Sequence, residues 1–325
     1  MHIVVLTPVL NDWIAARELL FRLDAAFAPK ADTVSILIVD DGSSEKPPAD
    51  FGVGPYTCLR EVGVIKLKKN LGHQRALAIG LCHIAEKVPG DAIVIMDADG
   101  QDDPHDAVRL VEKLHDLDRR ECPAPPIIFA ERTRRSESFV FRFCYLAYRV
   151  LHYLLTGRGV RFGNFSVIPR AWLSGLTVEP MLWNHYAASV IVSRVPFVTI
   201  PTRRGVRIAG NSQQSFVKLV IHGLSALSCY NETIGVRFLL ASTVLLGLSL
   251  VGILTTLSLT LVADLPLPDW TLLFAGMLVV FLLQVLTLAS NFTMQMIGAR
   301  SVQPFLPARD YSWYIERVDC FFCQS

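Results

Sequence analysis

Two long apolar stretches constrain the fold of this chain more than any other feature. Neither Phe238–Ala263 nor Trp270–Gly298 contains a charged residue. As a helix, each stretch is long enough to cross a hydrocarbon core of about 30 Å. The connection Asp264–Asp269, DLPLPD, contains prolines and acids that predict a tight reversal. The sequence therefore predicts a hairpin of two transmembrane helices.

The charges that flank this hairpin predict its orientation. Arg237 precedes the first stretch and Arg300 follows the second, whereas the connection has no Lys or Arg. The positive-inside rule then places both chain ends in the cytosol. The segment MHIVVLTPVLND at the start has neither a basic leader nor a long apolar core, so we expect no signal peptide.

Short apolar runs alternate with helical patterns before the hairpin. The runs typical of strands are His2–Leu6, Val34–Val39, Val62–Leu67, Ala92–Met96 and Ile127–Ala130. The helical patterns are Trp13–Phe27, Gly72–Lys87 and Ala107–Asp118. This alternation predicts an α/β domain, with a Rossmann-like, mostly parallel sheet and helices on both of its faces.

We expect four segments along the chain. These are a cytosolic domain (1–212), a juxtamembrane amphipathic helix (213–235), the two transmembrane helices (236–298) and a cytosolic tail (299–325). Phe139–Leu155 and Phe216–Tyr230 have apolar stripes at helical spacing. Each is predicted either to lie on the lipid surface or to pack on the protein core.

Charge and cysteine usage narrow the class of partner. The net charge of +2 hides local arginine clusters that suit an anionic membrane surface or a phosphate ligand, and we expect no nucleic-acid partner. The clusters contain Arg132, Arg134, Arg135, Arg142, Arg149, Arg158, Arg161, Arg203, Arg204 and Arg207. The seven cysteines are scattered and odd in number, which predicts no disulfide framework.

An acidic run, MDADGQDDP, follows the strand-like stretch that ends at Ile95. Its carboxylates should lie at the carboxyl end of a buried strand, which is the edge where open α/β sheets bind ligands. Asp97 and Asp99 share one face of an extended segment, and Gln101 continues that face. Three hard oxygen ligands at this spacing suit Mg²⁺ or Mn²⁺, and such a site suits a diphosphate.

The same run allows a second interpretation. An acidic loop can be only a solvated turn, in which the carboxylate of Asp103 caps a helix that begins near Pro104. For Asp103 the capping role is the expected one, and for Asp97 and Asp99 the metal role.

Motifs at the predicted strand ends resemble those of family 2 glycosyltransferases, in the branch of dolichol-phosphate mannose synthase and bacterial polyprenyl-phosphate glycosyltransferases. TPVLND is similar to the opening of the family, VDDGSS to its nucleotide-contacting turn, NLGHQRALAIG to the helix that follows, and DADGQDDP to its metal site. The resemblance covers the soluble domain and extends to the hairpin of the bacterial members. It implies a GT-A type fold, an inverting enzyme and a bacterial inner membrane location.

The resemblance implies a donor site and a metal site. Nucleotide-sugar binding falls to Pro8, Asn11, Asp40, Asp41, Asp97 and Ser212. The metal ligands of the family match Asp97, Asp99 and Gln101. A divalent cation there, Mg²⁺ or Mn²⁺, would neutralise charge on the departing nucleotide.

The resemblance also implies a lipid phosphate as acceptor. Arg132 and Arg135 stand where the phosphate-contacting arginines of the family follow the fifth strand, and a solvated arginine face is the alternative. Asn164 stands where several bacterial relatives have Asp, and a neutral amide accepts no proton. Either Asn164 positions substrate or the reaction needs no base, because the second pKa of a phosphate monoester is about 6.

The segment RIAGNSQ resembles RxxGESK, a loop that closes over the donor in the family. Arg207, Gly210 and Ser212 match, whereas Asn211 and Gln213 replace the Glu and the Lys. These replacements leave both the sugar and the choice between UDP and GDP open. His185 is expected either to contact the donor sugar or to pack in the protein.

The sequence thus predicts a membrane glycosyltransferase that moves one sugar from a nucleotide sugar to a polyprenyl phosphate, for the cell envelope. Its proposed catalytic residues are Asp99, Arg132, Asn164 and Arg207. The alternatives are transfer to another lipid or glycan acceptor, and a catalytically inactive membrane anchor subunit. Polar residues in the second apolar stretch, namely Gln284, Asn291 and Gln295, need partners within the membrane and suit a homo-oligomer.

Overall fold

The computed structural model describes residues 1–118, 124–132, 139–157, 159, 163–203, 205, 207, 216–263, 268, 270–299 and 305–324. The chain forms two compact units. One contains 1–146, 160–229 and 305–325, and the other contains 147–159 and 230–304.

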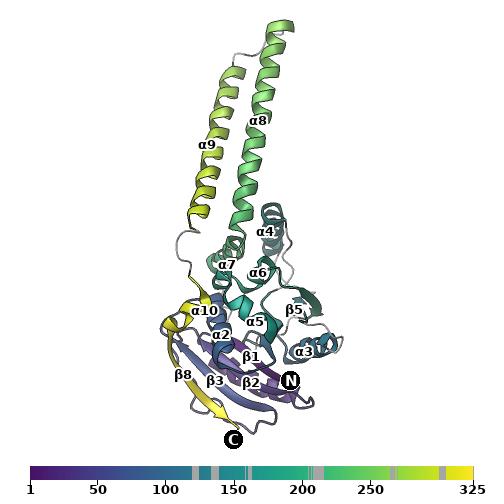
Figure 1. Cartoon of the computed structure of the whole chain (residues 1–325), viewed down its shortest axis with the longest axis vertical. Helices are drawn as coiled ribbons and strands as arrows, with labels where there is room; N and C mark the ends of the chain where they lie inside the picture. Colours follow the sequence, from purple (N-terminus) through teal and green to yellow (C-terminus); the bar gives the residue numbers. More distant parts are fainter. Residues whose placement is uncertain are drawn as a thin grey trace. The chain divides into compact units, whose positions relative to one another are not determined.

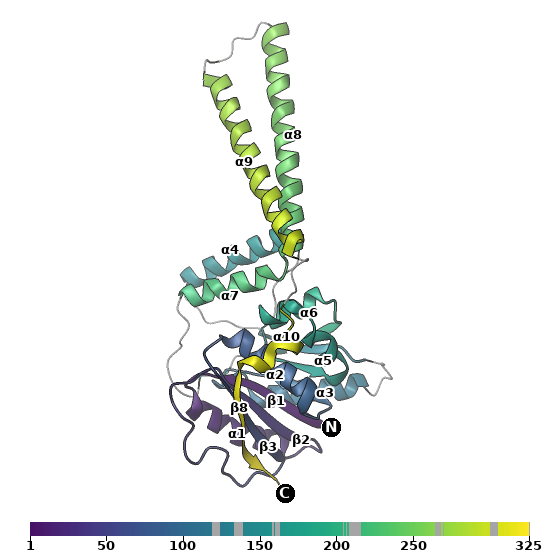
Figure 2. The same ribbon diagram turned by 60° about the vertical axis from the view of Figure 1, so that its left-hand side comes forward.

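The first unit is built on a mostly parallel sheet, in the order β7-β5-β6-β4-β1-β2-β3-β8. Figures 1 and 2 show β1, β2, β3 and β8 side by side. The β1–β2, β2–β3, β1–β4 and β5–β7 pairs are parallel, whereas β6 and β8 pair antiparallel with their neighbours. The strands are β1 (His2–Val9), β2 (Thr33–Asp40), β3 (Leu59–Leu67), β4 (Ala92–Ile95), β5 (Ile127–Arg132), β6 (Ser166–Pro169), β7 (Phe197–Thr202) and β8 (Ile315–Cys323).

This topology brings the carboxyl ends of six strands, and the start of β6, to one edge of the sheet. The carboxyl ends of β1, β2, β3 and β4 share that edge because these strands are parallel. β6 is antiparallel both to β4 and to β5, so β5 and its parallel neighbour β7 end at the same edge, and β6 begins there. The residues that follow those ends, and those that precede β6, can therefore meet.

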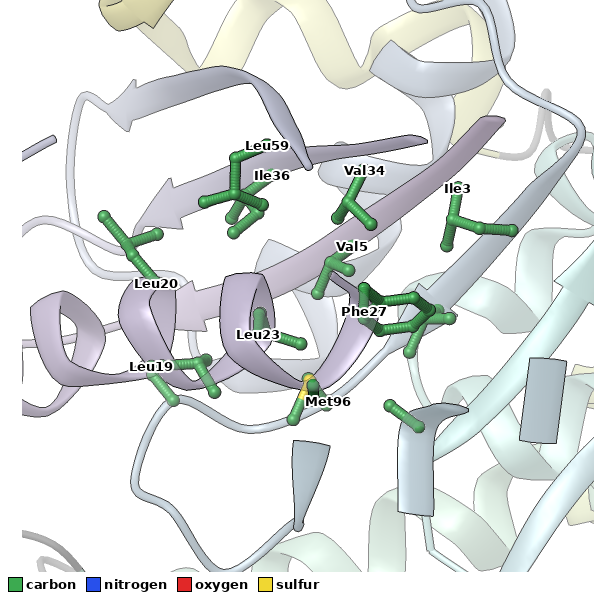
Figure 3. Close-up of a cluster of buried hydrophobic side chains, with 14 of the residues drawn as sticks. Ile3, Val5, Leu19, Leu20, Leu23, Phe27, Val34, Ile36, Leu59 and Met96 are labelled. Atoms are coloured by element: carbon green, nitrogen blue, oxygen red, sulfur yellow. The ribbon is translucent and has the colours of Figure 1, made fainter. Parts of the chain in front are cut away.

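Helices cover both faces of the sheet, each over its own apolar core. Figure 3 shows Leu19, Leu23 and Phe27 of one helix in the same buried cluster as Val5 and Ile36 of the strands. The helices of the first core are α1 (Trp13–Phe27) and α3 (Pro104–Asp118). Those of the second core are α2 (His73–Lys87), α5 (Arg170–Thr177), the 3₁₀ helix η1 (Pro180–Trp183) and α6 (Tyr186–Val192). The α/β sheet with helices on both faces is thus confirmed.

Two amphipathic helices lie where the sequence predicts them: α4 (Phe139–Thr156), between β5 and β6, and α7 (Phe216–Ser228), after β7. On α7, Val220, Ile221 and Leu224 are exposed, whereas Ala226 and Leu227 are buried. The exposed apolar face favours contact with lipid over complete burial in the protein.

The second unit contains the predicted hairpin, formed by α8 (Asn231–Ala263) and α9 (Trp270–Ala299). Both helices are long and apolar enough to cross a membrane, and only 6% and 11% of their most apolar windows are buried in the protein. They are therefore not the buried core helices of a soluble domain. Gly235 permits close packing of the pair, because a Cβ there would lie 3.2 Å from Met296 Sδ and 3.4 Å from Thr293 Oγ1. The homo-oligomer expected from Gln284, Asn291 and Gln295, which all lie on α9, stays a prediction.

The segment after the hairpin departs from the sequence prediction. Residues 299–325 are predicted as a tail, but within them α10 (Pro307–Asp310), η2 (Tyr311–Tyr314) and β8 belong to the sheet unit. β8 pairs antiparallel with β3, with a register shift between Val62 and Gly63. That irregularity and an exposed outer face obscure the alternation by which a strand is recognised.

The buried side chain of Tyr311 fixes this returning segment. Its hydroxyl donates to Glu86 of α2, and the side chain is 2% exposed, whereas Trp313 two residues later is 70% exposed. The backbone N–H of Lys68 donates to the carbonyl of Tyr314 (3.0 Å).

We predict that Tyr311→Ala destabilises the protein by about 3–5 kcal/mol, because it empties a buried aromatic site. The matched change Trp313→Ala should cost less than about 0.5 kcal/mol, because that ring is in solvent. Thermal unfolding of the two purified variants measures both effects. Equal melting temperatures would show that the returning segment does not dock on the sheet.

Candidate functional site

The turn after β4 carries two partly exposed carboxylates. The side chains of Asp97 and Asp99 are 38% and 18% exposed, and Ala98 between them is buried. Asp102 is only 3% exposed, and its Oδ2 accepts the backbone N–H of Asp97 (3.0 Å). Asp99 Oδ1 accepts the N–H of Gln101 (2.9 Å). Backbone hydrogen bonds thus hold the turn in the conformation that brings out Asp97 and Asp99.

Asp103 caps α3, as the sequence predicts. Its Oδ1 accepts the N–H of His105 (2.9 Å), and Pro104 occupies the first helical position.

The segment after β7 packs closely on this turn. The N–H of Gly205 donates to the carbonyl of Gln101 (2.8 Å). A Cβ at Gly205 would lie 2.6 Å from the carbonyl oxygen of Gly100 and 3.3 Å from that of Gln101. The absence of a side chain at Gly205 therefore permits the contact.

Arg207 connects the carboxylate turn to the segment after β1. Its Nη2 donates to Asp12 Oδ2 (3.0 Å), and its Nη1 lies 3.7 Å from Asp99 Oδ2. The guanidinium and both carboxylates are partly buried, so solvent screens the interaction less than on an open surface. A positive charge is therefore held beside Asp99.

The turns after β1 and β2 are joined by hydrogen bonds. Asn11 has a positive φ of 57°, and its N–H donates to Ser43 Oγ (2.9 Å). Asn11 Oδ1 accepts from the N–H of Glu45 (3.1 Å), and Asp40 Oδ1 accepts from the N–H of Ser43 (2.8 Å). Pro8 lies near the end of β1 and is partly exposed. These hydrogen bonds fix the turns after β1 and β2 against each other, and Asp40 itself is buried.

Asp41 has a structural role, and its donor-binding role stays a prediction. It is buried, and its two oxygens accept the N–H groups of Leu71 (2.7 Å) and Gly72 (2.9 Å). Burial raises the pKa of Asp41 above its usual value, against the lowering effect of these two bonds. The carboxylate thereby fixes the turn that starts α2.

Asn164 belongs to a polar network at the start of β6. Its Nδ2 lies 2.9 Å from Nε2 of His73, and its Oδ1 accepts from Gln74 Nε2 (3.3 Å). The same His73 nitrogen lies 3.5 Å from Asp97 Oδ1. Desolvation lowers the pKa of His73, against the charges of nearby carboxylates. The ring of His73 therefore lies between the side chains of Asn164 and Asp97 and connects them.

His185 is the N-cap of α6 and is buried. Its Nδ1 accepts the N–H of Ala188 (3.3 Å), which supports the packing role among the two roles considered. Its ring lies against that of His222 on α7.

Some predicted residues are placed only by the backbone or not at all. Arg132 is the last residue of β5, at the shared edge, and pairs in register with Thr202 of β7. Five others lie outside the described residues: Arg135, Gly210, Asn211, Ser212 and Gln213.

The donor set of the turn fits a divalent cation. Asp97 and Asp99 offer hard carboxylate oxygens at the open edge of the sheet, with the partly exposed Gln101 next to them. Within the described part of the chain, no three His, Cys, Asp or Glu side chains converge as a complete metal site. A cation here would therefore need further oxygens, which Gln101, water or a diphosphate can supply.

Three positions of the site do not appear among the sequence predictions. Asp102 lies in the acidic run but faces inward, and only packing distinguishes it from its neighbours. The role of Gly205 can be recognised only when the contact between the segment after β7 and the turn is known. His73 lies in the motif NLGHQRALAIG, and this motif is the sequence feature that could have identified it.

A family model and similar proteins agree on one class of enzyme. A family model described as "Glycosyl transferase family 2" matches residues 4–175. An undecaprenyl-phosphate 4-deoxy-4-formamido-L-arabinose transferase of Klebsiella pneumoniae (strain 342) is 27% identical over 243 residues, which cover 70% of this chain and 67% of that protein. A transferase of the same name from Salmonella paratyphi A is 25% identical over 251 residues, covering 75% and 72%.

The chain is also similar to solved structures. Mannosyl-3-phosphoglycerate synthase of Rubrobacter xylanophilus has a TM-score of 0.46 and 17% identity, covering 70% of this chain and 72% of its own. Glucosyl-3-phosphoglycerate synthase of Mycobacterium tuberculosis, in complex with Mn²⁺, uridine diphosphate and phosphoglyceric acid, has a TM-score of 0.47 and 13% identity, covering 72% and 78%.

We predict that Gly205→Ala lowers kcat/KM roughly 10- to 100-fold, because the added Cβ displaces the turn that carries Asp97 and Asp99. Gly175→Ala is the matched control, since a Cβ at Gly175 meets no atom within 4 Å. Steady-state kinetics of both variants measures kcat/KM and tests this prediction. Wild-type activity in Gly205→Ala would show that the β7 segment does not hold the turn.

Proposed function

The chain belongs to glycosyl transferase family 2, and we propose that it moves one sugar from a nucleotide sugar to a polyprenyl phosphate at the cytosolic face of a membrane. The observation that carries this proposal is the open pair of carboxylates, Asp97 and Asp99, in a chain that also has two apolar helices of membrane-spanning length. The names of the Klebsiella and Salmonella relatives support the choice of acceptor, since both act on undecaprenyl phosphate.

The donor diphosphate is assigned to the edge between β1 and β4. A divalent cation held by Asp97, Asp99 and Gln101, either Mg²⁺ or Mn²⁺, would supply electrophilic stabilisation of the departing nucleotide. Arg207 adds a fixed positive charge 3.7 Å from Asp99. Pro8, Asn11, Asp40 and Asp41 remain the proposed contacts to the nucleoside, and Ser212 a proposed contact outside the described residues.

The transfer step needs no general base. An anionic phosphate oxygen of the acceptor attacks the anomeric carbon as the bond from that carbon to the diphosphate oxygen breaks. The electron pair leaves with the nucleoside diphosphate, and the configuration inverts. A phosphate monoester with a second pKa of about 6 is already largely dianionic at neutral pH. Asn164, which accepts no proton, is compatible with this chemistry as a positioning residue.

The acceptor is assigned to the β5 and β6 side of Asp97. Arg132 ends β5 at this edge, and guanidinium groups bind phosphate in a bidentate manner. Arg135 is a second proposed contact, outside the described residues. The chain leaves the sheet unit after Cys229 and returns to it at Phe305, so both ends of the hairpin lead to the same domain. With Arg237 and Arg300 at those ends, we propose that the sheet and both termini are cytosolic.

The proposal is tested by incubating the purified chain with Mg²⁺ or Mn²⁺, undecaprenyl phosphate and a panel of UDP- and GDP-linked sugars. Mass spectrometry of the lipid should find one donor whose single sugar is added to the lipid phosphate. Product on another lipid or glycan alone would assign a different acceptor. Absence of turnover with every donor and acceptor would favour the inactive anchor.

We predict that Asp99→Asn lowers kcat roughly 100- to 1000-fold, because it weakens the hold on a cation whose contribution is several kcal/mol. Asp103→Asn is the matched control, since Asn caps a helix as well as Asp does. Rates measured across a Mn²⁺ titration test both changes. Equal rates for Asp99→Asn and the wild type at every Mn²⁺ concentration would contradict the metal assignment.

A further inference from the structure

The amide side chains of α9 are exposed on the surface of the hairpin. They belong to Gln284, Asn291 and Gln295, and none of them has a hydrogen-bond partner among the residues that the structure describes. The hydroxyls of Thr287 and Thr293, by contrast, donate to carbonyls of their own helix (both 2.8 Å). The hydroxyls are therefore satisfied within α9, whereas the amides are not.

These amides lie on the side of α9 that faces away from α8. Leu282 and Ala289 of α9 are buried, and Thr293 Oγ1 donates to the carbonyl of Gly235 on α8 (3.4 Å). Each of the three amides follows one of these α9 residues by two positions, which corresponds to a rotation of about 200° around the helix. Helix α8 of the same chain therefore does not cover the amides.

The depth of Gln284 makes an unpaired amide costly. It lies at the middle of the span Trp270–Gly298, fourteen residues from either end. At 1.5 Å per residue each end is about 21 Å away along the helix, so the side chain does not reach water. An amide without a hydrogen-bond partner in hydrocarbon costs several kcal/mol. Gln284 therefore requires a partner from another molecule in the membrane.

The exposed side of α9 has the spacing of a helix-pairing seam. Met277, Val280, Gln284, Thr287 and Asn291 follow one another at alternating intervals of three and four residues, and all are exposed. This is the spacing along which two helices pack as a left-handed pair. We call these five residues the amide seam. It is a surface for one further helix.

A second copy of the chain supplies that helix with matching chemistry. Two copies in one membrane have the same orientation, so their α9 helices are parallel and Gln284 of each lies at the same depth. An amide carries both a donor and an acceptor, so it can pair with an identical amide across a two-fold axis. The apolar stretch of α8, Phe238–Ala263, contains no Asn or Gln, which leaves α9 as the helix that offers such a partner.

We propose that α9 packs against α9 of a second copy through the amide seam, with the side chain of Gln284 hydrogen-bonded to Gln284 of the partner subunit. Polar side chains on such a seam fix the register and the number of helices, and the apolar residues between them supply the packing. The inference does not depend on the proposed function, because it requires only that the hairpin lies in a bilayer.

The test measures self-association of the full-length chain in lipid vesicles, by single-molecule photobleaching over a range of protein-to-lipid ratios. The wild type should form dimers that dissociate on dilution in lipid. Gln284→Leu should raise the dissociation constant roughly 3- to 30-fold, as expected for loss of one hydrogen bond between membrane helices. Gln284→Asn, which keeps an amide, should recover part of the lost affinity.

Thr255→Val is the matched control for the loss of a polar group. Its hydroxyl is exposed on α8 but donates to the carbonyl of Val251 in the same helix (2.8 Å), so this change should leave the dissociation constant within twofold of the wild type. A wild type that is monomeric at every ratio would overturn the inference. Equal association of Gln284→Leu and the wild type would also overturn it.

Oxidative cross-linking tests the position of the interface. Val280→Cys on the amide seam and Val251→Cys on α8 change the same residue type at similar exposures of 56% and 61%. Copper phenanthroline should join Val280→Cys into disulfide-linked dimers and leave Val251→Cys at the level of the wild type. Equal cross-linking at both positions would place the interface elsewhere and overturn the inference. Absence of transfer to any polyprenyl phosphate in the same preparation would contradict the proposed function alone.

Discussion

The position of Asp97 and Asp99 depends on one hydrogen bond, from the backbone N–H of Asp97 to the buried carboxylate of Asp102. A buried carboxylate is stable only when its oxygens are hydrogen-bonded, so the turn after β4 has little freedom to reverse which acids face inward. With Asp102 inside, Asp97 and Asp99 must face the open edge of the sheet. The repulsion between two neighbouring carboxylates is then offset by the Arg207 guanidinium, and by a cation where one binds.

The topology of the sheet brings residues from distant parts of the chain to the turn after β4. Strands β1, β2, β4, β5 and β7 end at one edge, and β6 begins there, so residues nearly two hundred positions apart become neighbours. Arg207 reaches Asp12 in this way, and Gly205 reaches the backbone of Gln101. The proposed function would use this arrangement to separate the two substrates, with the nucleotide on the β1 and β2 side of Asp97 and the lipid phosphate on the β6 and β5 side. A direct displacement requires such opposed binding.

The sequence predicts those parts of the fold in which local pattern and tertiary structure agree. The bounds of α1 agree with the prediction at both ends, because its apolar residues repeat at helical spacing over four turns. β6, SVIP, begins with a serine and ends with a proline, whereas the equally short β4, AIVI, is apolar throughout, and β8 joins the sheet from beyond the hairpin. Neither β6 nor β8 therefore has a local pattern strong enough to be recognised. In the site, spacing predicts the outward faces of Asp97 and Asp99. It does not distinguish Asp102, nor does it show that Asp41 holds the backbone of Leu71 and Gly72, because both roles depend on burial.

The most direct test of this account is anomalous diffraction from crystals grown with Mn²⁺ and the nucleoside diphosphate of the active donor. We expect one manganese peak at about 2.1 Å from carboxylate oxygens of Asp97 and Asp99, with the diphosphate on the β1 side and Asp102 still buried. A manganese ion bound by the nucleotide but remote from both carboxylates, or an Asp102 side chain turned to solvent, would contradict the central claim.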